Sequence, residues 1–385
     1  MEVFKNGLFV SRRVGDFPFR DGPIVEVTAD ETVDSAFRKL VEHRILSAPV
    51  WDASKGVYLG FFDITDALAL IYSVDLLITA IPDSMLKKST ALRLASSGSA
   101  CPDCTALTVG SVFQDAVGLD GQPGRGQASW NPVTNDAPMA QVIFLLATST
   151  RRVPVIDPQT KRVVKILSQS LVTHVLNESL KELEARNEPL PELFNKTPAS
   201  SGGFGLRNDI ITVSAEDNCA RDAFHKIVQH GVSAVAVLDD EGKILSSITT
   251  KDVRLFKSME EAALQRLQAE RNKRDGIVQP THAADDSVDA AADFDSKRNL
   301  ALMDLDCGDF CSMIELTAAN KGITMVPVIV VQADTSIRRM IAKMAQTRKH
   351  RVWVVDEFRR PIGVVSVSDI CKLLVTDPGK GKDMF

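Results

Sequence analysis

The sequence predicts a mixed α/β protein built from four copies of one supersecondary unit. Three observations predict this fold: an apolar segment that ends in Asp occurs four times, a second apolar segment follows each one after a polar turn, and an amphipathic helical pattern precedes each pair. Two apolar segments joined by a short polar turn are typical of a β-hairpin. The recurring order of strand, helix, strand, strand and helix therefore predicts a repeat protein.

Each predicted hairpin is marked by the aspartate at which its first strand ends. These aspartates are Asp52, Asp157, Asp239 and Asp356. The helices expected upstream read ETVDSAFRKLVEHR, APMAQVIFLLATST, NCARDAFHKIVQHG and TSIRRMIAKMAQTRK, and a short extended piece precedes each. In the fourth helix Met340 and Met344 are one turn apart, so we expect both to face the core. A second helix is expected after each hairpin, over 64–80 in the first copy.

One copy of about 60 residues leaves an apolar face exposed and is too small to be stable alone. We therefore expect copy one to pair with copy two, and copy three with copy four. The predicted division is copy one at 1–86, an insertion at 87–129, copy two at 130–190, a linker at 191–208, copy three at 209–258, a second linker at 259–300 and copy four at 301–385. Ser and Gly in the first insertion, and Ala and acidic residues in the second linker, predict a flexible insertion and a partly disordered linker.

Composition excludes several classes of function. The chain has 385 residues and a formal net charge of -5, which argues against a nucleic-acid binder with a broad basic face. No apolar run is long enough for a membrane span, and the N-terminal stretch lacks the apolar core of a secretory signal, so we expect a cytoplasmic or nuclear protein that does not bind membranes. Cys101 and Cys104 form a CxxC, and Cys307 and Cys311 a CxxxC. Neither cluster contains a histidine, so we expect reduced thiols and no metal.

Three aspartates stand at the start of the helix that follows a hairpin: Asp66, Asp252 and Asp369. The hydroxyl residues near the last two are Thr249, Ser366 and Ser368. A carboxylate can accept hydrogen bonds from both hydroxyls of a ribose, and such charge-assisted bonds are strong. The alternative is a helix cap, because the free backbone amides of the first turn favour Asp. Three aspartates in the same phase of the repeat favour nucleotide binding over capping alone.

The stretches SAPVWD, RVPVIDP, GVSAVAVLDDEGK and HRVWVVDE with GVVSVSDI resemble tandem cystathionine-β-synthase (CBS) domains. Within that family the chain resembles the four-repeat γ subunits of AMP-activated and SNF1-related protein kinases, over nearly its whole length apart from the insertions. The resemblance implies an α/β (α+β) fold of four CBS repeats, arranged as two tandem pairs in a disc-like array. It also implies that the three aspartates hold the ribose of an adenine nucleotide. Copy two has Leu171 at this position, and the γ subunits lack the aspartate in the same copy.

The resemblance further implies which residues bind the phosphates. The matching residues are Arg151, Arg152, His350 and Arg351, with Ser233 as the small polar residue of copy three and Thr249, Ser366 and Ser368 as hydroxyl ligands. Arginine can bind phosphate oxygens bidentately, and histidine adds a pH-sensitive donor. The alternative is that these basic residues complement the C-terminal dipole of the preceding helix. Leu46 and Ser170 stand where γ subunits usually have Arg and Lys, and Asp63 would repel phosphate, so we expect a weak first site.

The sequence lacks a phosphate-binding loop of the GxxxxGK[ST] type, a kinase motif set and a Ser-His-Asp set. We therefore expect nucleotide binding without hydrolysis, no cofactor and no enzymatic activity. The leading hypothesis is a non-catalytic γ-type subunit that binds AMP, ADP and ATP competitively and assembles with the catalytic and scaffold subunits of a protein kinase. The alternatives are a regulator of a non-kinase partner, such as a phosphatase or a transporter, and a scaffold that binds no nucleotide.

Overall fold

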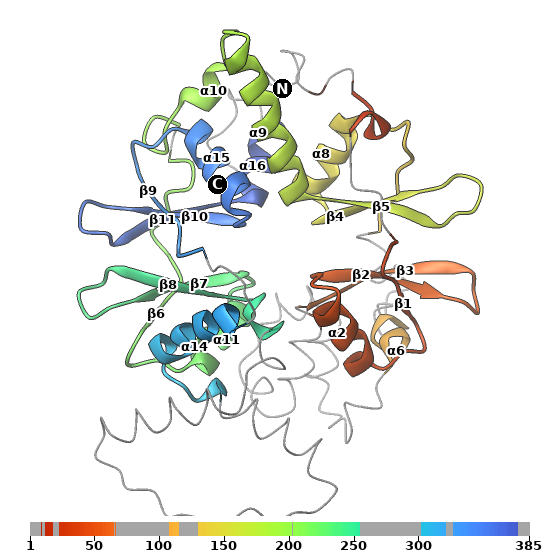
Figure 1. Ribbon diagram of the computed structural model, residues 1–385, viewed down its shortest axis with the longest axis horizontal. Helices are drawn as coiled ribbons and strands as arrows, with labels where there is room; N and C mark the ends of the chain where they lie inside the picture. The colour runs from red at the N-terminus through yellow and green to blue at the C-terminus, as the bar shows by residue number, and fades with distance from the viewer. Residues whose placement is uncertain are drawn as a thin grey trace, which may run out of the picture. The chain divides into compact units, whose positions relative to one another are not determined.

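The computed structural model describes most of the four copies (Figure 1). The residues that it describes are 9, 12–17, 23–64, 66, 108–114, 130–201, 203–254, 302–320 and 326–375. The chain forms two compact units, one made of residues 1–67, 88–210 and 329–385 and the other of residues 68–87 and 211–328. Copies one, two and four therefore contribute their hairpins to the first unit, and copy three contributes its hairpin to the second.

Each copy contains the predicted hairpin and the helix before it. Copy one has β1 (Val27–Thr28), α2 (Val33–Glu42), β2 (Ser47–Asp52) and β3 (Val57–Asp63). Copy two has α8 (Met139–Thr148), β4 (Arg152–Ile156), β5 (Val163–Ser168) and α9 (Gln169–Ala185). Copy three has β6 (Thr212–Ser214), α11 (Ala220–Gln229), β7 (Ala234–Leu238) and β8 (Ile244–Thr249). Copy four has β9 (Val330–Gln332), α15 (Ile337–Thr347), β10 (Arg351–Val355), β11 (Pro361–Ser366) and α16 (Val367–Val375).

The strands pair in the same way in every copy. The short first strand runs parallel to the next one, as β1 does to β2, and the second and third strands form an antiparallel hairpin. In copy two a single parallel bridge between Val133 and Val155 takes the place of the first strand. Each hairpin has one bulge near the end of its first strand. The predicted order of strand, helix, strand and strand is confirmed.

The aspartate at the end of each first strand shapes the turn of its hairpin. In copy three the Asp239 carboxylate accepts the N–H of Glu241 at 3.0 Å and the N–H of Lys243 at 2.7 Å. Asparagine and aspartate side chains commonly bond the backbone of a turn in this way. Each turn also has one residue with positive φ, and these residues are Gly56, Lys161, Gly242 and Arg359. Glycine adopts this conformation without steric cost, which explains its place in copies one and three.

Copies one and three are each completed by a helix that lies outside the predicted bounds of that copy. They are α6 (Val109–Gln114) and α14 (Cys307–Asn320). The sequence-based division put the first within the insertion at 87–129 and the second within copy four. The structure instead packs α6 against the hairpin of copy one, and α14 against β8 and α11 of copy three. These two boundaries therefore differ from the prediction.

The start of each of these helices bonds the backbone that follows the first strand of its copy. The Gly110 N–H donates to the Ala29 carbonyl at 2.7 Å, and the Gly308 N–H donates to the Ala215 carbonyl at 2.9 Å. A Cβ at position 110 would lie 2.7 Å from the Ala29 oxygen, so the close approach requires glycine. The two copies are thus completed by the same long-range contact.

The linker at 191–208 is folded against copy four. It contains the short helix α10 (Glu192–Asn195), whose Phe194 side chain is fully buried. The Lys196 carbonyl accepts the N–H of Ile337, the first residue of α15, at 2.9 Å. This contact satisfies one of the backbone donors that a helix leaves unpaired at its N-terminus.

One apolar core joins copies two and four. Leu146 of α8, Leu176 of α9, Met340 of α15 and Ile370 of α16 are all buried in it. Burial of such a side chain stabilises the fold by about 1.5 to 3 kcal/mol. The predicted core positions Met340 and Met344 are confirmed, since both side chains are buried in this cluster.

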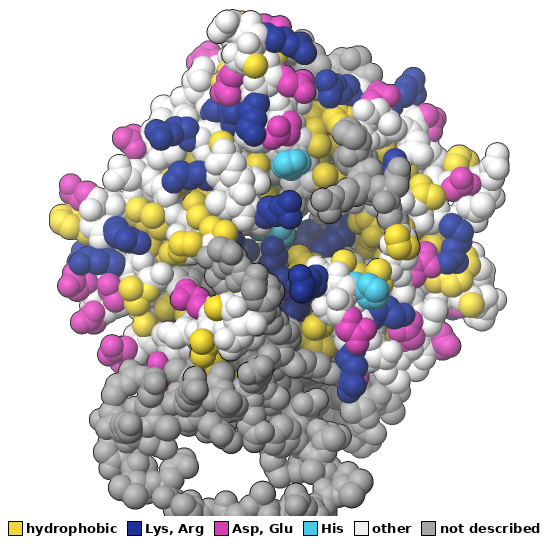
Figure 2. Space-filling model, in the orientation of Figure 1, with side chains coloured by type: hydrophobic (Ala, Val, Ile, Leu, Met, Phe, Trp, Pro, Cys, Tyr) yellow, Lys and Arg dark blue, Asp and Glu magenta, His cyan; other side chains and the backbone are white. Residues whose placement is uncertain are grey.

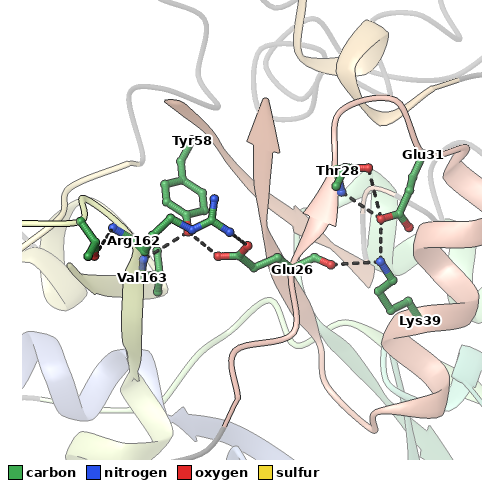
Figure 3. A network of polar contacts seen from close by, with 8 residues as sticks. Glu26, Thr28, Glu31, Lys39, Tyr58, Arg162 and Val163 are labelled. Carbon is green, nitrogen blue, oxygen red and sulfur yellow. Dashed lines mark hydrogen bonds and ion pairs between the residues drawn. The ribbon is translucent and has the colours of Figure 1, made fainter. Parts of the chain in front are cut away.

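Copies one and two contact each other through a polar and aromatic cluster (Figure 3). The Glu26 carboxylate contacts both the Tyr58 hydroxyl and the Arg162 guanidinium, and the Val163 N–H donates to the Tyr58 hydroxyl oxygen at 3.2 Å. The Arg162 guanidinium also lies 4.1 Å from the ring centroid of Trp51. Burial, reinforced by Glu26, raises the pKa of Tyr58 to about 12. The hydroxyl therefore remains a proton donor at neutral pH.

The described surface carries charges of both signs. Figure 2 shows acidic and basic side chains interspersed on the visible face. Among the described residues, no helix has the length and apolar content needed to cross a bilayer. Within the same residues, no group of three or more His, Cys, Asp and Glu side chains is placed to hold a metal ion. The helix predicted over 64–80 beyond residue 66, the CxxC and most of both insertions lie outside the described residues.

Candidate nucleotide-binding corners

The candidate site lies where each hairpin ends and the next helix begins. We use the word corner for the last residue of a hairpin and the three residues after it. The four corners are residues 63–66, 168–171, 249–252 and 366–369. In the first, third and fourth corners one backbone bond fixes the helix start: the N–H after the strand donates to the carbonyl of Leu46, Ser233 and His350, respectively. These three residues are therefore structurally equivalent.

The aspartate of a corner makes the same hydrogen bond in three copies. The Oδ2 atoms of Asp66, Asp252 and Asp369 accept the backbone N–H of the residue three positions earlier, at 2.9, 2.6 and 2.8 Å, respectively. A carboxylate that reaches back to this N–H is one half of a capping box. The capping alternative is thus realised in the structure, and it occupies one oxygen of each carboxylate.

The corner of copy four is the most fully built. Asp369 Oδ2 accepts the Ser366 hydroxyl at 2.6 Å as well as its N–H, and Asp369 Oδ1 lies 3.6 Å from a guanidinium nitrogen of Arg207. The Asp369 side chain is 12% exposed. A largely buried carboxylate that is held by a hydroxyl on one oxygen has a second oxygen that can accept from a ribose hydroxyl.

Ser368, a predicted hydroxyl ligand, makes a contact with copy two that the sequence did not predict. Its hydroxyl donates to the Oε1 atom of Gln169 at 2.7 Å, and the Gln169 amide donates to the Leu146 carbonyl at 2.8 Å. Ser368 therefore links the corner of copy four to the corner of copy two. In the structure its hydroxyl is committed to this contact and not to the position of a ribose.

The corner of copy two contains no carboxylate. Ser168 caps α9 by accepting the Leu171 N–H at 3.3 Å, so a hydroxyl performs the capping role here. The Ser170 hydroxyl lies 2.9 Å from the Nε2 atom of His350. Two of the predicted features, the missing aspartate and the histidine, are thus brought together across copies two and four.

In the corner of copy three the predicted hydroxyl residue Thr249 contacts the aspartate. The Thr249 hydroxyl donates to Asp252 Oδ2 at 2.9 Å, and the Lys251 N–H donates to the Thr249 hydroxyl oxygen at 3.2 Å. Arg254 follows in the same turn, and burial lowers the pKa of its guanidinium, an effect that the charge of Asp252 opposes. The predicted small polar residue Ser233 lies at the start of this hairpin, bonded through its carbonyl to the corner.

The corner of copy one is dominated by a second carboxylate. Asp63 Oδ2 accepts a hydrogen bond from an Arg152 guanidinium nitrogen at 2.9 Å. Burial raises the pKa of Asp66 to about 7, and the charge of Asp63 adds to the rise, while Arg151 and Arg152 oppose it. A raised pKa favours the protonated form of Asp66, which is a poorer acceptor for ribose hydroxyls than the carboxylate. The weakness of the first site stays a prediction, and this electrostatic environment supports it.

The predicted cations do not gather at one corner. Arg151 and Arg152 lie near Asp66, His350 contacts Ser170, and Arg351 pairs with Ser366 across the hairpin of copy four. Arg152 is engaged by Asp63, and its role as a phosphate ligand stays a prediction. Sequence reasoning missed Arg207, because only the fold brings the linker beside Asp369.

Comparison with known proteins assigns the repeat. The CBS domain family matches residues 14–73, 205–258 and 321–376. Protein SDS23 of Yarrowia lipolytica is 24% identical over 344 residues, which cover 89% of this chain and 56% of that protein. The 5'-AMP-activated protein kinase subunit gamma-3 of Homo sapiens is 22% identical over 353 residues, which cover 90% of this chain and 55% of that protein. The chain thus spans about half the length of the curated relatives it matches.

A solved structure shows the same fold. Protein MJ1225 from Methanocaldococcus jannaschii, proposed to be an archaeal homolog of g-AMPK, matches with a TM-score of 0.54 at 13% identity. The match covers 92% of this chain and 96% of that chain. At this level of identity the likeness concerns the fold alone. The predicted α/β fold of tandem repeats is confirmed.

Proposed function

We propose that this chain, three segments of which match the CBS domain family, is a non-catalytic regulatory subunit that binds adenine nucleotides. The observation that carries the proposal is the corner of copy four. There, a largely buried Asp369 carboxylate is held in place by the Ser366 backbone and hydroxyl. A carboxylate with fixed orientation and further lone pairs can accept a ribose hydroxyl without reorganising.

AMP, ADP and ATP would compete at such a corner. The three nucleotides share the adenine and ribose but differ in phosphate charge. The predicted phosphate ligands in the same unit include Arg151, His350 and Arg351, of which the last two belong to copy four itself. A ligand changes the conformational balance only through different affinities for two states, so these cations would translate phosphate number into a regulatory signal.

The proposed partners are the catalytic and scaffold subunits of a protein kinase, in the cytoplasm or nucleus. The similarity to the gamma-3 subunit of 5'-AMP-activated protein kinase supports this proposal. The name of a second relative, Protein SDS23, mentions no kinase, so a regulator of a partner that is not a kinase, such as a phosphatase or a transporter, stays the second candidate. Affinity purification from native extract, followed by mass spectrometry, separates the two. Kinase subunits among the captured proteins support the first candidate, and their absence beside a captured phosphatase or transporter contradicts it.

Nucleotide binding is tested by calorimetry with AMP, ADP and ATP on the purified chain. We expect binding of all three without release of phosphate. Asp369→Ala should weaken AMP binding about ten- to a hundredfold, because it removes a hydrogen-bonded carboxylate. Asp252→Ala should have a smaller effect, and Asp66→Ala the smallest of the three.

Two further variants separate ribose binding from capping. Asp369→Asn keeps an oxygen that can accept the Ser366 N–H, so it should preserve the thermal midpoint, but it lacks the charge and should weaken AMP binding. Leu171→Ala is the control, because copy two offers no carboxylate and its substitution should leave AMP affinity unchanged. A folded Asp369→Asn protein that binds AMP as tightly as the parent would contradict the ribose role.

A further inference from the structure

The linker before copy three lies along the last strand of copy four. The Gly205 carbonyl accepts the Val364 N–H at 2.8 Å, and the Arg207 N–H donates to the Ile362 carbonyl at 3.1 Å. Leu206 forms an isolated antiparallel bridge with Gly363. The linker thus extends the sheet of copy four at the edge formed by β11, immediately before the corner.

Two glycines allow the linker backbone to lie this close to β11, and a buried aromatic ring holds the linker there. A Cβ at Gly363 would lie 2.1 Å from the Gly205 oxygen, which no side chain tolerates. Gly205 has a φ of +78°, and a Cβ there would lie 2.3 Å from a Val365 methyl carbon. The neighbouring Phe204 ring is 1% exposed. The backbone of Arg207 is therefore placed by packing, and its side chain begins at a defined point beside the corner.

Arg207 covers the carboxylate oxygen that capping leaves available. Its guanidinium nitrogen lies 3.6 Å from Asp369 Oδ1, while Oδ2 is held by Ser366. The Arg207 side chain is 47% exposed and the Asp369 side chain only 12%. An ion pair of this length with one half-exposed partner is weak and easily exchanged for another interaction. A ribose that approaches Asp369 must compete with Arg207 for Oδ1.

We propose that Arg207 is a latch that a nucleoside must displace from Asp369 when its ribose binds. The proposal rests on the proposed function, because it assumes that this corner accepts a vicinal diol. It adds an affinity-setting residue that lies before β6, in the segment predicted as a linker. The chain continues from Arg207 through a few residues to β6 at Thr212. The corner of copy four is thereby coupled to the linker through one side chain.

The latch predicts that removing Arg207 strengthens nucleoside binding. Arg207→Ala should raise the affinity for adenosine about two- to fivefold, since a half-exposed ion pair no longer has to be broken. Arg207→Lys is the matched control, because it keeps a cation within reach of Asp369 and should bind adenosine nearly as the parent does. Calorimetric titration of the full chain with adenosine measures both, and thermal melting verifies that each variant is folded.

The same titrations with AMP test whether Arg207 instead binds phosphate. If Arg207 binds phosphate, Arg207→Ala will weaken AMP binding and leave adenosine binding unchanged, which overturns the latch. Unchanged affinity for both ligands in Arg207→Ala also overturns it, while binding by the parent leaves the proposed function intact. Failure of the parent and both variants to bind either ligand overturns both proposals. Binding by Arg207→Ala alone supports a latch that closes the corner.

Discussion

The corners of copies one and four share one backbone geometry but differ in their chemistry. In both, an aspartate accepts the N–H three residues before it. In copy four that earlier residue is Ser366, whose hydroxyl donates to the carboxylate, whereas in copy one it is Asp63, whose charge opposes ionisation of Asp66. The comparison teaches that the capping box preserves the shape of a corner, while the residue at its first position decides whether the carboxylate is suited to a ribose.

The residues around the corners of copies one and four differ as well. The corner of copy four is supported by the docked linker and by the contact between Ser368 and Gln169. In copy one the Arg152 guanidinium that the sequence assigns to phosphate is paired with Asp63. A cation that is paired with a carboxylate can bind a ligand only if the ligand breaks the ion pair. The two corners thus differ in support as well as in charge.

The largest expected effect comes from the docking of the linker on copy four. Gly363→Ala places a Cβ 2.1 Å from the Gly205 oxygen, so the two backbones must separate. We expect the free energy of unfolding to fall by roughly 1 to 3 kcal/mol, the usual cost of overpacking. Urea denaturation measures it.

A glycine in an ordinary environment is the control for this substitution. A Cβ at Gly308 has its nearest atom at 3.4 Å, so Gly308→Ala should cost much less. Equal stability of the two variants would show that the linker does not depend on the close approach. Loss of adenosine binding in a folded Gly363→Ala protein, with retained stability, would point to a corner that is displaced but not unfolded.

A smaller effect is expected from the contact between copies two and four. Ser368→Ala leaves the Oε1 atom of the buried Gln169 without its donor, which should lower the free energy of unfolding by about 1 kcal/mol. Nucleotide affinity should change little. The measurement is urea denaturation beside calorimetry, with Ser312→Ala as the control, because that exposed hydroxyl bonds only the carbonyl of Gly308. A Ser368→Ala protein that keeps its stability but loses affinity would restore Ser368 as a ribose ligand.

The smallest expected effect is a change of stability with pH, which arises from Asp66 in copy one. The folded pKa of Asp66 is about 7, raised from the ordinary value of 3.8. Between these values the folded chain holds a proton that the unfolded chain has released, so this group makes the protein less stable as pH rises through that range. Asp66→Asn cannot titrate and should lack this contribution.

Thermal melting of parent and variant at about pH 5 and about pH 8 tests the sign. The midpoint of the parent, measured relative to Asp66→Asn, should be higher at the lower pH. Parallel changes in the two proteins would show that Asp66 titrates as an ordinary exposed carboxyl. The corner of copy four supplies the comparison, since it has Ser366 in place of the second carboxylate.

Much of the fold could be predicted, because the signals lie within each copy. The apolar hairpins, the aspartate at each turn and the helix before each hairpin are local patterns, and all appear in the structure. The helices α6 and α14 could not be assigned in the same way. The first is short, and both join copies from which long segments of chain separate them, through contacts such as that of Gly110 with Ala29. Nothing in their own periodicity says which copy they complete.

The positions of the three aspartates could be predicted from the sequence. The partners that come from distant parts of the chain could not. The phase of the repeat located Asp66, Asp252 and Asp369, and the structure gives all three the same bond. The pairing of Arg152 with Asp63 and the approach of Arg207 to Asp369 join residues far apart in the chain. Such pairs arise from the packing of one copy or linker on another, which no single stretch of sequence encodes.

The helices α6 and α14 follow the rest of their copies late in the sequence. Their position affects the order in which the copies fold during synthesis. Copy one cannot form the bond between Ala29 and Gly110 until the ribosome has made the insertion as far as Gly110, and copy three must wait for Gly308 in the same way. Translation adds about 5 to 20 residues per second, so each half-built copy leaves part of its sheet uncovered for several seconds. The nascent chain is then open to chaperones, or to a subunit made nearby, before either copy closes.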